Sequence, residues 1–221
     1  MERVLIESLV LAAGGIVSVG SITIVILLLI SDGGWRKGAA YTLGYTGGYT
    51  LIGLAAVLLG AKASQAEPSG GGIAAGLSAA VGVLLLWISL RNARKAPVES
   101  QGPPRLFAMV DQTTAGKAFG LGALVTVINF KNLAIFLSAV SVPVTSNLTL
   151  PSQLLIVLLD VLVFCAAVMA PILIYLAFPA GAKERLTRFK AWLEARRRPI
   201  GIWLPAFFGL LFFLRGIRGW L

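Results

Sequence analysis

The chain has 221 residues, of which 57% are hydrophobic and only 13% charged, and its formal net charge is +10. A soluble domain carries about 25% charged residues, so we interpret the chain as an integral helical membrane protein. Its basic residues gather in loops between apolar segments, which indicates membrane topology and argues against a nucleic-acid partner. The absence of histidine and of carboxylate clusters argues against a metal, and we expect no cofactor.

Six apolar segments approach the length of a transmembrane helix, which needs about 20 residues. We expect them at 4–30, 39–60, 73–90, 116–145, 152–178 and 200–214, within a single transmembrane domain, 1–221. The first and fourth are the longest and exceed the ~30 Å hydrocarbon core, so they must tilt, kink or break. They take the same place in each half. This predicts an all-α polytopic protein of two inverted three-helix repeats, 1–95 and 116–221, with broken or kinked first and fourth helices.

The distribution of basic residues predicts the orientation. The loops after the first, third and fifth spans hold most of the lysines and arginines, whereas the opposite side holds only Arg3, Lys62, Arg215 and Arg218. The positive-inside rule therefore places both chain termini outside and the three basic loops in the cytoplasm. We expect Arg215 and Arg218 to snorkel at the end of the sixth span.

The first span contains three glycines and three hydroxyl residues between Gly14 and Thr23. This composition favours a kink or an unwound stretch that offers polar groups from Ser18, Ser21 and Thr23. Close helix packing through small residues would explain the same composition, and the sequence leaves both readings open.

The second span carries a stripe of tyrosines at helical spacing, Tyr41, Tyr45 and Tyr49. The stripe could line a cavity or form part of the packed core. Gly44 and Gly48 lie beside it at GxxxG spacing, which predicts a face for close packing against another helix.

The fourth span contains Asn129, Lys131 and Asn132 in the middle of an apolar run. Counting from Thr145 places Lys131 roughly 21 Å deep, too far for its side chain to snorkel. A lysine at this depth indicates either a cation on a substrate or proton path or the anchor of a helix break. Counting from Pro151 places Asp160 in the fifth span about 14 Å deep, and a lysine side chain spans the difference of about 7 Å. We predict that Asp160 pairs with Lys131 directly or through water. The alternative is that Asp160 accepts from a backbone or hydroxyl donor between helices.

Residues 182–198 have the pattern of an amphipathic helix at the membrane interface. Its apolar residues fall on one face and basic residues surround them: Leu186, Phe189, Trp192, Leu193; Lys183, Arg185, Arg188, Lys190, Arg196, Arg197, Arg198. Such a helix would lie on the anionic cytoplasmic leaflet, although a positive-inside loop without further role has the same composition.

The six spans, the polar stretch in the first and the Asn129-Phe130-Lys131-Asn132 motif in the fourth resemble the LysE translocator superfamily, whose members carry Asn-Pro-Lys at this place. Phe130 stands where proline is usual, and Ser18–Ser21 replaces a small proline-containing motif. The apolar run 22–29, the length and the long basic loop look most like the glycolipid-addressing (GAP or Sap) family of actinobacterial membrane proteins. The resemblance covers nearly the whole chain.

The resemblance implies a transporter in the plasma (inner) membrane that moves an envelope lipid or glycolipid by alternating access. Lys131 would attract an anionic head group or carry a proton-coupled charge, with Asp160 neutralising it in one state. Asn129, Asn132, Ser18 and Ser21 would supply hydrogen bonds at the helix breaks.

Membrane lipids and an anionic or glycolipid cargo are the expected partners, and other envelope export proteins and a second copy of the chain are further candidates. Export of a small solute, such as an amino acid or cation, is an alternative, and so is a role as an accessory subunit of an envelope lipid export complex. An enzyme is not expected, because the sequence shows no nucleophile–base pair and no metal-ligand spacing.

Overall fold

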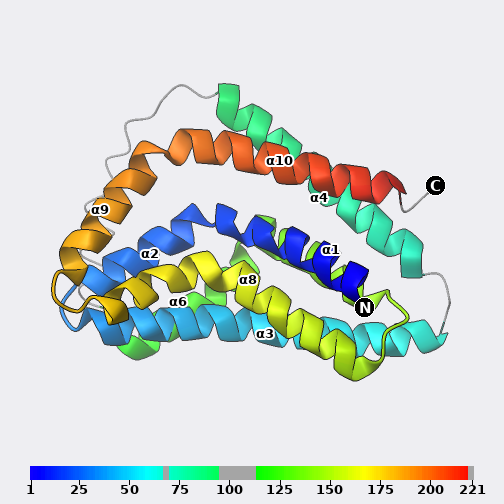
Figure 1. Ribbon diagram of the computed structural model, residues 1–221, viewed down its shortest axis with the longest axis horizontal. Coiled ribbons are helices and arrows are strands. Elements are labelled where there is room, and N and C mark those ends of the chain that lie inside the picture. Colours follow the sequence, from blue (N-terminus) through cyan, green and yellow to red (C-terminus); the bar gives the residue numbers. More distant parts are fainter. Residues whose placement is uncertain (67–69, 95–112, 219–221) are drawn as a thin grey trace.

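The computed structural model describes residues 1–66, 70–94 and 113–218, and the regular elements in these ranges are all helices (Figure 1). They are α1 (Glu2–Ala12), the 3₁₀ helix η1 (Ala13–Val17), α2 (Val19–Ile30), α3 (Gly34–Ala66), α4 (Gly70–Arg94), α6 (Ala115–Ile128), α7 (Phe130–Val144), α8 (Leu150–Ala177), α9 (Ala182–Ala195) and α10 (Arg197–Arg218). The all-α prediction is confirmed for this part of the chain. Most of the long basic loop expected after the third span lies outside the described residues.

Three of the described helices, α3, α8 and α10, are long and apolar enough to cross a membrane. Two bent pairs, α1–α2 and α6–α7, pass the same test if each pair counts as one span. The described helices therefore provide three to five candidate spans. Helix α4 covers the expected third span and is not among them, so the described helices do not establish the six-span arrangement.

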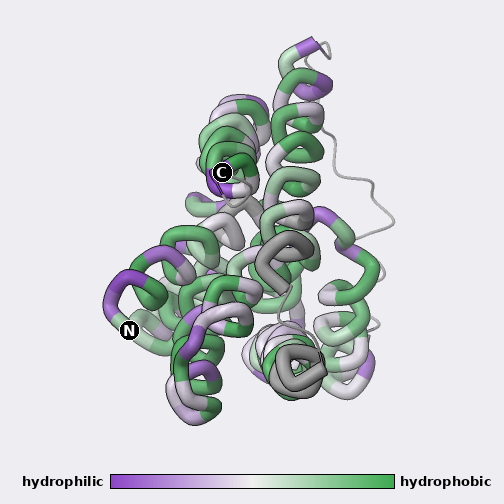
Figure 2. The backbone as a smooth tube through the Cα atoms, turned by 90° about the vertical axis from the view of Figure 1, so that its right-hand side faces the viewer, coloured by the Kyte–Doolittle hydropathy of each residue, from purple (hydrophilic) through white to green (hydrophobic). Residues whose placement is uncertain are grey.

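The outer surface of the helices is rich in large apolar side chains. Leu51, Phe130 and Trp203 are each at least 70% exposed. Figure 2 shows hydrophobic residues along most of the tube, with hydrophilic residues concentrated toward helix ends and turns. Apolar exposure on this scale indicates helices surrounded by hydrocarbon.

The helices run between two ends of an elongated bundle. The start of α1, the end of α10 and the connection between α7 and α8 lie at one end, whereas the turns before α3 and before α9 lie at the other (Figure 1). Helices α4 and α10 pack along each other as a pair, and α3 packs extensively against α6 and α8.

Both expected helix breaks are present. The chain bends by 62° between α1 and α2 and by 72° between α6 and α7. The backbone leaves helical geometry at Ser18 (φ −80°, ψ 51°) and at Asn129 (φ −81°, ψ 74°). The Asn129 side chain accepts a hydrogen bond from the Asn132 backbone N–H at 3.3 Å, so it caps the new helix. An asparagine cap thus starts α7, and Phe130 stands where the LysE superfamily, which the sequence resembles, has proline.

Close packing between α3 and α6 depends on the glycines of the predicted packing face. A Cβ atom on Gly44 would meet the Phe119 carbonyl, and one on Gly48 would lie 2.7 Å from the Thr126 hydroxyl oxygen. Gly122 on α6 fits equally tightly against the backbone of Tyr41 and Tyr45. The interpretation of Gly44 and Gly48 as a packing face is therefore confirmed.

Replacing Gly44 by alanine should destabilise the protein by about 1–3 kcal/mol, because the new methyl group would push α6 away from α3. Gly47 is the matched control on the same helix, since a Cβ atom there meets nothing within 4 Å. Gly47→Ala should be neutral or stabilising by up to about 1 kcal/mol through helix propensity. Melting curves of both solubilised variants test this prediction, and equal melting temperatures would contradict it.

Helix α9 differs from the expected interfacial helix in what its apolar face contacts. Leu186 and Leu193 are buried in the protein core, and Phe189 packs against that core from its edge. The face contacts α2 and α8, so protein rather than lipid covers most of it. Trp192 remains 46% exposed. The helix ends at Ala195, before the basic run that begins at Arg196.

Candidate functional site

The two helix breaks meet in the interior of the bundle. Asn132, the third residue of α7, donates its side-chain amide to the Ser18 hydroxyl at 2.8 Å. The same amide lies 3.4 Å from the Tyr45 hydroxyl, which is also 3.4 Å from Ser18. All three side chains are buried. The polar contact Ser18–Asn132–Tyr45 therefore joins the first span, the fourth span and α3 at one point.

Two helix N-termini converge at this contact, because α2 begins directly after Ser18 and α7 begins directly after Asn129. Helix N-termini carry partial positive charge and exposed backbone N–H groups, an arrangement that favours anions. The Asn132 side-chain oxygen is buried without a hydrogen-bond partner within the described residues. The site thus has the polar and electrostatic character of the binding sites that broken helices form in membrane transporters.

The tyrosine stripe of α3 is fully buried beside the polar contact. Tyr41 and Tyr45 stack with ring centroids 6.2 Å apart, and Tyr49 lies 5.0 Å from Tyr45. Tyr49 also packs against Phe136 of α7 and Phe164 of α8, at 4.8 and 4.7 Å. Only Tyr45 of the three reaches Ser18 and Asn132, so the stripe forms an aromatic wall next to the polar contact.

The other residues expected at the breaks lie around this contact with different roles. Lys131 is the second residue of α7 and its side chain is half-buried. Ser21 is buried on the first turn of α2. The Thr23 hydroxyl donates to the Val19 carbonyl of its own helix at 2.9 Å, so it stays with its own helix. Asn129 acts through its cap on α7.

The first span combines both features that its composition allowed, a helix break with a polar group and close packing through glycine. A Cβ atom on Gly15 would lie 2.7 Å from the Phe164 ring of α8, and one on Gly14 would lie 2.8 Å from Ile135 of α7. The glycines let the broken stretch pack closely on α7 and α8, while Ser18 supplies the polar group. Gly20 meets nothing within 4 Å and takes no part in this packing.

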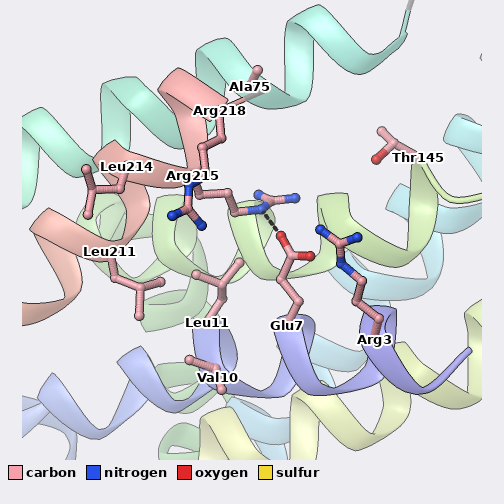
Figure 3. Close-up of a pocket in the computed structure, with 10 residues that line it drawn as sticks. All are labelled: Arg3, Glu7, Val10, Leu11, Ala75, Thr145, Leu211, Leu214, Arg215 and Arg218. Carbon is pink, nitrogen blue, oxygen red and sulfur yellow. Dashed lines mark hydrogen bonds and ion pairs between the residues drawn. The ribbon is translucent and has the colours of Figure 1, made fainter. Parts of the chain in front are cut away.

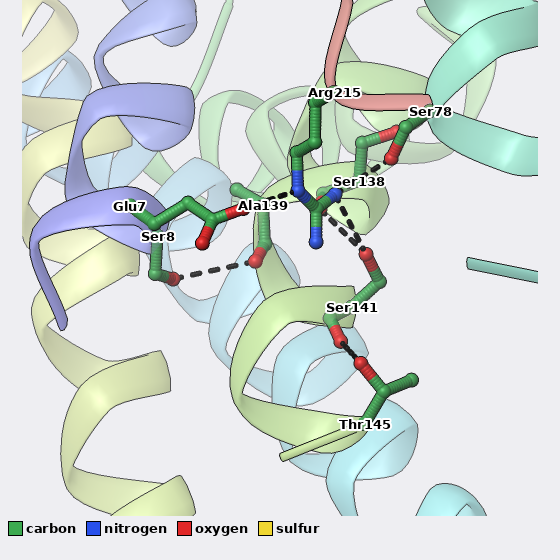
Figure 4. Close-up of polar contacts among 8 residues, drawn as sticks. All are labelled: Glu7, Ser8, Ser78, Ser138, Ala139, Ser141, Thr145 and Arg215. Carbon is green, nitrogen blue, oxygen red and sulfur yellow. Dashed lines mark hydrogen bonds and ion pairs between the residues drawn. The ribbon is translucent and has the colours of Figure 1, made fainter. Parts of the chain in front are cut away.

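Arg215 does not snorkel as expected but points into the bundle. Its Nε donates to a Glu7 carboxylate oxygen at 2.7 Å, which ties α10 to α1 (Figure 3). Its Nη1 donates to the Ser78 hydroxyl at 2.6 Å and approaches the Ser138 carbonyl and the Ser141 hydroxyl at 3.4 and 3.5 Å (Figure 4). One guanidinium therefore connects α1, α4 and α7 to the end of α10.

Asp160 is fully buried in α8. Its carboxylate accepts a hydrogen bond from the Ser8 hydroxyl of α1. Ser8 also lies 3.3 Å from the Ala139 carbonyl (Figure 4). The hydrogen bond to Ser8 matches the alternative of a hydroxyl donor between helices, and the pairing of Asp160 with Lys131 stays a prediction. The other Asp160 oxygen has no hydrogen-bond partner among the described residues.

Sequence reasoning missed Ser8, Glu7 and Ser78 as members of these buried polar contacts. Glu7 and Ser8 carried a signal, because two adjacent polar residues interrupt an otherwise apolar run in the first span. Ser78 carried none, since serine is common among the small residues of membrane helices. Within the described residues no three His, Cys, Asp or Glu side chains gather in a way that could hold a metal.

The long apolar helices, the lipid-facing surface and the buried polar centre define a helical membrane protein. The family model of Sap, the sulfolipid-1-addressing protein, matches residues 9–218, so the chain belongs to this family. The resemblance to glycolipid-addressing proteins is thereby confirmed, and the family description indicates a lipid-related role. No curated protein and no solved structure matches the chain.

Proposed function

We propose that the protein is a transporter of the LysE superfamily that moves an envelope lipid or glycolipid across the plasma membrane by alternating access. The observation that carries this proposal is the Ser18–Asn132 hydrogen bond, which joins two helix breaks 114 residues apart at a buried polar centre. Broken helices that meet in this way form the substrate sites of secondary transporters. The family's association with a sulfolipid supports a lipid as the cargo.

The packing of the helices supports the inverted-repeat part of the proposal. In such a repeat, α1 and α2 correspond to α6 and α7, α3 corresponds to α8, and α4 corresponds to α10. The contacts follow this correspondence in part: α2 packs against α8 while α7 packs against α3, and the pairs α3–α8 and α4–α10 each pack together. A rocking motion of the halves would open Ser18 and Asn132 to alternate sides.

Each polar residue at the centre has a proposed role. Lys131, beside the α7 N-terminus, supplies the cation that attracts an anionic head group or carries the coupled proton. Asn132, Ser18 and Tyr45 bond one another in this conformation, and each would give up such a bond to form one with the cargo. Asn129 fixes the break, and Asp160 offers a buried carboxylate that neutralises Lys131 in another state.

The proposed orientation places both termini and the α7–α8 connection outside, in six spans that include α4. The Ser21 hydroxyl and the Tyr49 ring would flank the cargo path, and Thr23 would stabilise α2 beside it. Membrane lipids, other envelope export proteins and a second copy of the chain are the proposed partners.

Replacing Lys131 by alanine tests the proposal. In cells that produce only this variant, we expect the lipid at the cell surface to fall about tenfold or more, the effect of losing one charge-assisted contact. Lys117→Ala on the exposed start of α6 is the matched control and should export normally. Extracted surface lipid is compared at equal protein level. Normal export by Lys131→Ala would show that the lysine does not handle cargo.

A further inference from the structure

A pocket of about 550 Å³ opens between α1 and α10 at the end of the bundle where α1 starts and α10 ends (Figures 1 and 3). It is separate from the polar centre at Ser18 and Asn132. Three arginines and one glutamate line it, together with aliphatic side chains: Arg3, Glu7, Arg215, Arg218, Val10, Leu214. The pocket therefore combines a basic part and an apolar part.

The charges in this pocket do not balance. Glu7 is bound to Arg215, whose remaining hydrogen bonds go to Ser78 and neighbouring groups of α7. Arg3 and Arg218 are exposed and form no ion pair within the described residues. Figure 3 shows their guanidinium groups on either side of the Arg215–Glu7 pair. Two cations are thus directed at one pocket that holds a single, already paired carboxylate.

The polar and apolar parts follow the same order along both helices. On α1 the lining runs from Arg3 to Val10 and Leu11, and on α10 it runs from Arg218 back through Leu214 to Leu211. Val10 is seven residue steps from Arg3, or about 10 Å of helix, and Leu214 is four steps from Arg218, or about 6 Å. The two terminal cations therefore sit at the bundle end, and the aliphatic groups lie about 6–10 Å further in. Two helices that present this same gradient complement a molecule with an anionic head and an apolar body.

The apolar part of the pocket is continuous with the lipid-facing surface. Val10 and Leu214 line the pocket and are 43% and 49% exposed. An acyl chain whose head group lies between the arginines could leave the pocket sideways along these two residues and stay in hydrocarbon.

We propose that this pocket binds the sulfate or phosphate head group of an anionic amphiphile between Arg3 and Arg218, with the apolar chain along Val10 and Leu214. Guanidinium groups are suited to these oxyanions because they can donate two parallel hydrogen bonds. The pocket lies on the side that the proposed orientation places outside. A role of the pocket in binding the exported lipid rests on the proposed function. Binding of an anionic amphiphile in itself rests on the geometry of the pocket alone.

The test measures lipid binding by the purified full-length protein in an uncharged detergent, with phosphatidylglycerol as the probe and phosphatidylcholine as the uncharged reference. Wild type should retain phosphatidylglycerol preferentially. The Arg3→Gln/Arg218→Gln variant should bind it about tenfold or more weakly, because two charge-assisted contacts are lost. Lys117→Gln/Lys183→Gln removes the same charge from exposed positions on α6 and α9 and should bind as wild type does. Equal binding by all three proteins would overturn the proposal.

A competition arm separates a lipid head group from a free anion. Inorganic phosphate or sulfate at millimolar concentration should leave bound phosphatidylglycerol in place, because free anions gain nothing from Val10 and Leu214. Displacement at that concentration would overturn the amphiphile assignment. The single variant Leu214→Gln, which leaves all three arginines intact, should also weaken lipid binding, and unchanged binding would count against the apolar contact.

Failure of this inference is distinguishable from failure of the proposed function. If Arg3→Gln/Arg218→Gln binds lipid normally while Lys131→Ala abolishes export, the pocket assignment falls and the transporter proposal stands. If lipid binding is lost in the arginine variant while Lys131→Ala exports normally, the pocket assignment stands without the proposed role of the central lysine.

Discussion

Replacing Asn132 by leucine should lower the stability of the protein and abolish export together. Leucine is close to asparagine in size but removes the amide that bonds Ser18 at 2.8 Å and approaches Tyr45 at 3.4 Å. Both hydroxyls are buried, and a buried polar group that loses its partner costs about 1–3 kcal/mol. We expect the free energy of unfolding to fall by about 2–3 kcal/mol, since Ser18 and Tyr45 keep each other as partners.

For a chain of this length, that loss corresponds to a melting temperature lower by about 4–12 °C in the solubilised protein. Thr50→Val is the control, because it removes a hydroxyl that bonds the Thr46 carbonyl of its own helix and lies outside the contact between the breaks. It should change the melting temperature little and leave lipid export intact. If Asn132→Leu melted and exported like Thr50→Val, the polar contact between the helix breaks would be unimportant for both properties.

Replacing Arg215 by methionine should be the most destabilising single change at the terminal end of the bundle. Methionine keeps an aliphatic stem of similar shape but leaves Glu7 without its cation and Ser78 without its donor. Ser78 is fully buried and the Arg215 side chain is only 19% exposed. We expect a loss of about 2–4 kcal/mol, because one guanidinium serves groups on three other helices.

A double substitution separates the loss of hydrogen bonds from the cost of the unpaired charge. Glu7→Gln added to Arg215→Met should restore part of the melting temperature, since the remaining partner is then neutral. Arg218→Met, which breaks no ion pair in the described part of the chain, should melt within a few degrees of wild type. Equal losses for Arg215→Met and Arg218→Met would show that the buried network contributes nothing.

Local composition was enough to predict the helical class and the position of both helix breaks. Ser18 and Asn129 interrupt segments that are too long to cross the membrane straight, and the chain bends at both places. The GxxxG spacing of Gly44 and Gly48 likewise predicted the close helix packing that the structure shows at these residues. These features follow from length, small residues and polar caps, which act within a few turns of helix.

Residue depth, in contrast, did not identify every partner. By residue count Lys131 and Asp160 differ in depth by about 7 Å, within reach of a lysine side chain, yet Asp160 accepts from Ser8 of α1. Counting residues along a helix gives a position along its axis but not the direction in which a side chain points. The rotation of α8 about its axis turns Asp160 toward α1, and packing against α1, α2 and α3 fixes that rotation.

The sequence by itself determined a helical membrane protein with two broken segments, and a family resemblance that the family match confirmed. Only the tertiary structure decided which polar groups meet: Ser18 with Asn132, Ser8 with Asp160, and Glu7 with Arg215, across 114, 152 and 208 residues of chain. The physical reason is that buried polar groups must find hydrogen-bond partners, and their partners are chosen by how apolar helix faces pack.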